Sequence, residues 1–122
     1  METHLALTII GTVLSLVGIL FFLVPEKVNE KVMTDLSDSA VQPAAALRSV
    51  LGGSAMRSGL IAVLSRDFPA AQASSLLTAY GIGMSIMLVS ILLIKPRKFS
   101  DDIPLPPVVM FVILIGIAFY SA

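Results

Sequence analysis

Apolar residues fill four long stretches of this chain, and short polar or proline-containing segments separate them. The first stretch, Leu5 to Val24, has no charged residue and stops at Pro25, which cannot continue a helical hydrogen-bond ladder. A helix needs about 20 mostly apolar residues to cross a bilayer. The pattern predicts an all-α, polytopic membrane protein, a four transmembrane helix bundle with spans at about 5–24, 43–65, 70–94 and 104–121.

Proline and charged residues set the limits of the later spans. Pro43 suits the first turn of the second helix, and the segment 66–69 interrupts the chain before the third span. Lys95 and Pro96 end the third span. The fourth begins among the prolines of 104–107, so we expect it to have an irregular entry or to be short.

The connection after the first span, 25–42, has a helical pattern of its own. Its apolar positions recur at four-residue spacing, with one more beside them: Val28, Val32, Leu36 and Met33. Its charged positions repeat at the same spacing on the other side: Glu26 with Glu30, and Lys27 with Lys31. We therefore expect a short amphipathic segment in the first loop, which either lies along the membrane surface or covers the end of the bundle.

Composition places the whole chain in the membrane class. Hydrophobic residues make up 57% and charged residues 13%, with a mean hydropathy of +0.97. Four spans use most of the 122 residues, so we expect a single membrane domain over 1–122. The net charge is zero, which argues against a nucleic-acid partner, and the absence of Cys excludes disulfides and thiolate metal sites.

The distribution of Lys and Arg predicts the orientation. The first and third connections hold most of the basic residues outside the spans: Lys27, Lys31, Lys95, Arg97 and Lys98. The N-terminus, second connection and C-terminus together hold only Arg66. Basic loops face the cytoplasm in multi-pass proteins, so we expect both termini outside the cytoplasm.

Arg57 lies near the middle of the second span, and no Asp or Glu lies in any apolar stretch to pair with it. Arg48 and Arg66 are each nine positions away, so a continuous helix would place both on the opposite face, about 27 Å apart, as interface anchors. Arg57 needs other partners. The sequence offers hydroxyl groups, on flanking residues and on other spans: Ser54, Ser58, Thr12, Ser15, Thr78, Tyr80, Ser85 and Ser90.

Because these groups are neutral, an anion from outside the chain would be attracted to Arg57, to a site that includes Arg48, Ser54 and Ser58. The alternative is that carbonyl groups and water inside the bundle satisfy the guanidinium, which then has no further role.

Small residues at four-residue spacing predict close helix packing. The candidate packing positions lie on the second and third spans: Gly52, Gly53, Ala55, Gly59, Ala79 and Gly83. Gly11 and Gly18 on the first span are one heptad apart. These rows favour packing within the chain over a dimer interface, although Gly52 and Gly53 could instead loosen their helix.

The residues for most kinds of catalysis are missing. His4 is the single histidine and has no cluster of carboxylates beside it, so we expect no metal site. The serines have no His or Lys base within the spans, and no phosphate-binding loop or cofactor motif is present. We therefore expect no catalytic residues and no cofactor.

With the spans placed, the segments Leu16 to Pro25 (LVGILFFLVP) and Leu47 to Leu64 (LRSVLGGSAMRSGLIAVL) resemble the bacterial four-helix membrane proteins grouped as the DUF4345 family. The shared elements are the first helix ending in Pro25, and Arg48 followed by Gly52, Gly53 and Gly59. The resemblance covers less than half of the chain and implies a four-helix bundle in a bacterial inner membrane. It implies no activity.

Three hypotheses for function follow. The first is a non-catalytic accessory or scaffold subunit that packs in the membrane against other membrane protein subunits. The second is a binder or carrier of an anionic, lipid-like small molecule near Arg57, with membrane lipid as the partner. The third, an enzyme that uses Arg48 and Arg57 as electrostatic groups on a lipid or quinone, lacks a general base.

Overall fold

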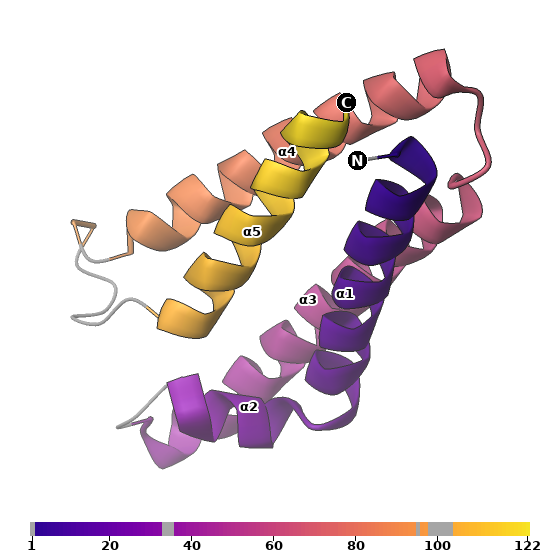
Figure 1. Cartoon of the computed structure of the whole chain (residues 1–122). Coiled ribbons are helices and arrows are strands. Elements are labelled where there is room, and N and C mark those ends of the chain that lie inside the picture. Colours follow the sequence, from indigo (N-terminus) through magenta and orange to yellow (C-terminus); the bar gives the residue numbers. More distant parts are fainter. Residues whose placement is uncertain (1, 33–35, 95, 98–103) are drawn as a thin grey trace. The chain divides into compact units, whose positions relative to one another are not determined.

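The computed structural model describes residues 2–32, 36–94, 96–97 and 104–122, and the regular structure in these ranges is entirely helical (Figure 1). Five helices follow one another along the chain: α1 (Thr3–Leu23), α2 (Pro25–Val32), α3 (Asp38–Leu64), α4 (Ala70–Leu92) and α5 (Leu105–Ser121). The chain divides into two compact units: unit 1 is Met1–Ile10 with Ser65–Ala122, and unit 2 is Gly11–Leu64. The all-α prediction is confirmed.

Two of the described helices, α1 and α4, are long and apolar enough to cross a membrane, by length and composition. The α5 helix is apolar but has only 17 residues. The α3 helix has 27 residues but is less apolar, because Arg48 and Arg57 lie within it. Two candidate spans are therefore present, and the bundle of four spans stays a prediction.

The α3 helix begins five residues before the predicted position at Pro43. The amide of Ala40 donates to the carbonyl of Ser37 at 2.9 Å, and Asp38 lies in the first turn, where a negative charge favours the helix dipole. Pro43 comes one turn later, so its missing N–H removes only one ladder bond close to the helix start.

The predicted amphipathic segment is in part the helix α2, which starts with Pro25 and follows α1 after the single residue Val24. Its four charged residues are exposed, as the pattern predicts. Its most buried side chain, however, is the polar Asn29, while Val28 is half-buried. Leu36 lies beyond the helix, and Met33 lies outside the described residues.

In unit 2, α1 and α3 touch backbone to backbone at glycines. A Cβ atom on Gly52 would lie 2.6 Å from the carbonyl oxygen of Gly18, and one on Gly18 would lie 2.5 Å from the carbonyl oxygen of Gly52. Gly11 and Gly59 make the same kind of contact one heptad away. The order of the two pairs shows that the helices run antiparallel. Only residues without a side chain permit this distance between two helices.

In unit 1, α4 and α5 pack side by side (Figure 1). Their buried residues form one face on each helix: Ala73, Leu77, Gly81 and Met84 on α4, and Leu114, Ala118 and Ser121 on α5. The ring of Phe119 lies against Gly81. The start of α1 adds the buried Leu7 and Ile10 to this unit.

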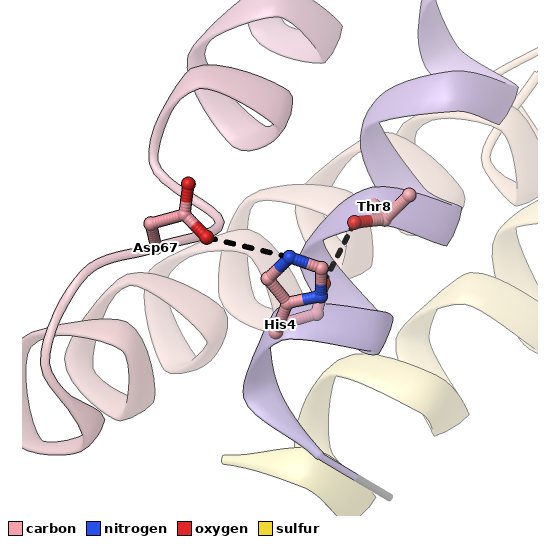
Figure 2. Close-up of polar contacts among 3 residues, drawn as sticks. All are labelled: His4, Thr8 and Asp67. Carbon is pink, nitrogen blue, oxygen red and sulfur yellow. Dashed lines mark hydrogen bonds and ion pairs between the residues drawn. The ribbon is translucent and has the colours of Figure 1, made fainter.

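One exposed polar contact in unit 1 joins the start of α1 to the turn before α4. The Nε2 atom of His4 lies 3.4 Å from Oδ1 of Asp67, and the hydroxyl of Thr8 donates to the carbonyl oxygen of His4 at 2.8 Å (Figure 2). The contact places the first turn of α1 beside the turn that precedes α4.

The glycine contact leads to a test with a neighbouring residue as control. Gly52→Ala should lower the free energy of unfolding by about 1–3 kcal/mol, because its methyl group meets the backbone of α1. A Cβ on Gly53 has nothing within 4 Å, so Gly53→Ala should gain up to about 1 kcal/mol from helix propensity. Thermal unfolding of the two variants in one detergent measures the difference. Equal stability of the two variants would contradict the described packing.

Candidate functional site

Arg57 is exposed on α3, and within the described ranges it has no hydrogen-bond or ion-pair partner. Several of the hydroxyls offered by the sequence bond the carbonyl four residues earlier in their own helix. Thr78 donates to Ser74 at 3.0 Å, Ser85 to Gly81 at 2.7 Å and Ser90 to Ile86 at 2.8 Å. The hydroxyl of Ser15 is buried against Gly59 without a partner. Arg57 is thus not satisfied by these groups.

Arg57 belongs to a stripe of exposed residues along α3, in which neighbouring members are alternately three and four positions apart in the sequence. We call this stripe the Arg57 seam: Leu47, Val50, Ser54, Arg57, Ile61 and Leu64. Val50 and Leu64 are 70% and 79% exposed, and Ser54 precedes Arg57 by one turn. Alternating steps of three and four place residues on one face, as at the seam of two paired helices.

The Arg57 seam faces away from α1. Ser54 lies two positions from Gly52, and Arg57 lies two positions from Gly59, which is about 200° around the helix. Since Gly52 and Gly59 touch α1, the seam is on the far side of α3 within unit 2. The seam is thus apolar at both ends, polar at its centre, and uncovered by the rest of its unit.

Arg48 has a different environment, because it lies on another face of α3. Its Nε–H donates to Oδ1 of Asn29 on α2 at 2.9 Å, and its guanidinium carbon lies 4.9 Å from the centre of the Phe21 ring. The sequence predicted an interface anchor aligned with Arg66. That alignment is wrong, because α3 ends at Leu64 and Arg66 lies in the following turn.

Asn29 completes this cluster and was missed by the sequence reasoning. Its side chain is only 3% exposed, and its Nδ2 atom is buried without a hydrogen-bond partner. The Nε of arginine only donates, so the oxygen of the Asn29 amide must face Arg48 and the NH₂ group must point elsewhere. The available signal was weak: Asn29 is the one uncharged polar residue of α2.

A second bond joins α2 to α3 beside this cluster. The Nε2 of Gln42 donates to Oε1 of Glu26 at 3.2 Å, with both side chains exposed. Among the described residues, the carboxylate of Glu26 is therefore bonded to Gln42 of α3, while Arg48 bonds the neutral amide of Asn29.

The structure distributes the predicted site residues over two faces of α3. Ser54 lies with Arg57 on the seam, Ser58 is half-buried and engaged in a contact, and Arg48 is with Asn29. Among the predicted packing positions, Gly52 and Gly59 are buried and Ala55 is half-buried. Ala79 is exposed, and a Cβ atom on Gly53 or Gly83 would have nothing within 4 Å.

Other parts of the described chain offer less chemistry. No group of three His, Cys, Asp or Glu residues that could hold a metal occurs in the described ranges. A shallow groove on unit 1 is lined by Ile82, Ser85, Ile86, Val89, Ser90 and Phe119. It is almost entirely apolar, and the hydroxyls of its two serines already bond carbonyls of their own helix. The two arginines of α3 are the strongest candidates for function.

Comparison with known proteins adds no family to this description. No protein-family model matches the chain, and no curated protein and no solved structure matches it. The resemblance of Arg48, Gly52, Gly53 and Gly59 to the DUF4345 pattern therefore stays a prediction.

The bond between Arg48 and Asn29 predicts how α2 is held to α3. Asn29→Leu removes the acceptor of a half-buried guanidinium and should lower the free energy of unfolding by about 1–3 kcal/mol. Asn29→Asp keeps an oxygen at the same place and should fold normally. The measurement is thermal unfolding, with the exposed Glu30→Gln as a control that leaves the midpoint unchanged. Equal midpoints for the leucine and aspartate variants would show that the bond contributes nothing.

Proposed function

We propose that this chain is an integral membrane subunit without catalysis of its own, and that it docks through the Arg57 seam onto a membrane-spanning helix of another protein. The partner helix carries an Asp or Glu that faces Arg57. The observation behind this proposal is that Arg57 is exposed and unpartnered, in the described chain, at the centre of an otherwise apolar seam.

The cost of inserting α3 supports a partner with a carboxylate. An arginine near the centre of a membrane helix costs about 2.5–3.5 kcal/mol on insertion scales, and a paired acid offsets part of this cost. The apolar ends of the seam, Leu47 with Val50 and Ile61 with Leu64, would pack against the same helix. Docking would thus neutralise the charge and bury the seam in one step.

A second copy of this chain fits the seam less well than a different protein. The sequence has no Asp or Glu between Asp38 and Asp67, so the α3 helix of another copy offers no carboxylate within its apolar part. A parallel pair of α3 helices would also place the two Arg57 residues against each other. Like charges opposed in a helix pair disfavour that pair.

The membrane topology within this proposal has four spans, α1, α3, α4 and α5, with both termini outside the cytoplasm of a bacterial inner membrane. The contact of His4 with Asp67 supports a common side for the start of α1 and the end of α3. The bond of Glu26 with Gln42 supports a common side for α2 and the start of α3. The basic residues Lys27 and Lys31 lie on α2, which makes that side the cytoplasmic one.

The second candidate, binding of an anionic lipid-like small molecule at Arg57, uses the same charge. It is favoured by the exposed Ser54, whose hydroxyl lies one turn from Arg57 on the seam. The shallow groove described above is lined by residues of α4 and α5 and by none of α3. Docking of a helix uses the whole seam, whereas a small ligand would use only its centre.

Photo-crosslinking tests the docking. A photoreactive phenylalanine analogue at Val50 or Ile61 should join the chain to one membrane protein, while the same group at Ile82, exposed on α4, should not. Arg57→Leu should abolish the crosslink and Arg57→Lys should retain most of it, because the lysine keeps the charge. Since Arg57 is exposed and makes no hydrogen bond or ion pair with a described residue, the leucine variant should remain monodisperse in detergent, which separates lost docking from lost folding.

Two results would refute the docking. One is a crosslink from Val50 and Ile61 that persists in full in Arg57→Leu. The other is that both positions crosslink to lipid alone. If Arg57→Leu also removes that lipid, the result supports the small-molecule candidate.

The absence of Cys allows a direct test of topology. Single cysteines at Phe68 and Ala122 should react with a membrane-impermeant maleimide in intact spheroplasts, and one at Ser37 should react only after the membrane is opened. All three positions are exposed, so access to the reagent decides the outcome. Labelling of Ser37→Cys in intact spheroplasts would contradict the proposed orientation.

A further inference from the structure

We infer that Arg48 and Asn29 form a binding site for a phosphate group, carried by an anionic phospholipid of the cytoplasmic leaflet. The phosphate donors of this site, Arg48 and Asn29, are not part of the Arg57 seam, although Leu47 borders both. It stands on the contacts among α1, α2 and α3 and does not require the proposed docking.

The cluster has an excess of hydrogen-bond donors. The guanidinium of Arg48 has five N–H groups, and its hydrogen bond to Asn29 uses only the one on Nε. The terminal nitrogens have no acceptor among the described residues, and neither does the buried Nδ2 of Asn29. A buried donor without a partner costs about 1–3 kcal/mol, so an acceptor from outside the chain would stabilise this arrangement.

The arrangement of the donors suits an oxyanion. The Oδ1 of Asn29 accepts from Nε, which fixes the orientation of the amide and leaves its buried NH₂ group as an unpaired donor. The ring of Phe21 lies over the guanidinium and restrains its orientation. Two phosphate oxygens can accept from the planar fork of arginine, and a further oxygen remains for the amide of Asn29. A carboxylate has only two oxygens, so one of them would have to accept from both Arg48 and Asn29.

The surroundings favour a lipid as the carrier of the phosphate. Exposed apolar side chains flank the cluster along both helices: Phe22 and Leu23 at the end of α1, and Leu47 and Leu51 on α3. Acyl chains could lie against these residues while the headgroup reaches Arg48. Lys27 and Lys31 on α2 add positive charge.

Two acids of α2, Glu26 and Glu30, are close in sequence to Asn29 and oppose an anion. Both are exposed to solvent, which weakens their repulsion, and Glu26 is bonded to Gln42. The two lysines balance their charge.

Ligand-induced stabilisation of the full-length protein in a neutral detergent tests the site. The probes are inorganic phosphate, short-chain phosphatidylglycerol, and diacylglycerol with the same chains as the phosphate-free control. Phosphatidylglycerol should raise the unfolding temperature in a concentration-dependent way, and diacylglycerol should not. Arg48→Gln and Asn29→Asp should each weaken this effect about tenfold or more, because each removes donors to the phosphate.

Arg57→Gln is the matched control, since it removes the same charge from the same helix outside the site. It should retain the full response. Asn29→Asp keeps the acceptor for Nε of Arg48, so its unfolding temperature without ligand should stay near that of the unmodified protein. Arg48→Lys provides a second variant that keeps the charge and loses the fork; it should bind several-fold more weakly.

The outcomes separate the two sources of phosphate. Stabilisation by phosphatidylglycerol alone supports the lipid, and equal stabilisation by inorganic phosphate supports the same site with a free phosphate ligand. The inference is overturned if neither probe stabilises the protein, or if Arg57→Gln loses the response as fully as Arg48→Gln does.

Discussion

The backbone contact between α1 and α3 is the constraint on which the rest of unit 2 depends. Gly11 and Gly18 on one helix meet Gly59 and Gly52 on the other, and no side chain separates them. This contact turns one face of α3 toward α1 and leaves the face with Arg57 uncovered. It also positions the end of α1, so that the ring of Phe21 lies over Arg48. The surroundings of both arginines thus depend on four glycines.

The two arginines of α3 show two ways in which a charge in an apolar helix is accommodated. Arg48 is held within its unit by an amide oxygen and an aromatic ring, and a short helix brings that amide into place. Arg57 has no such support in the described chain, although it is on the same helix and flanked by serines. The difference lies in the neighbouring elements: α2 packs against one end of α3, and no described helix of unit 2 covers the seam.

Much of the helical organisation could be predicted from apolar periodicity and proline positions. The helix limits at Leu23, Ala70 and Ser121 lie within a few residues of the predicted ones, because Pro25, Pro69 and the end of the apolar run are strong local signals. The start of α3 at Asp38 was missed, since proline is preferred in the first turn of a helix, whereas Pro43 lies in the second turn and costs α3 one ladder bond. The partner of Arg48 was missed for another reason: Asn29 is 19 positions away, and only the tertiary fold brings the two together.

The spacing of the four glycines also determines how α1 and α3 are aligned along their length. The pairs Gly11 with Gly59 and Gly18 with Gly52 coincide in a single register. A slide of one helix by seven residues would bring Gly18 to Gly59 and leave Gly11 and Gly52 each without a glycine partner. Only one of the two glycine contacts would then remain. The register is therefore determined by two glycine pairs at once, which makes a seven-residue slide of one helix along the other energetically costly.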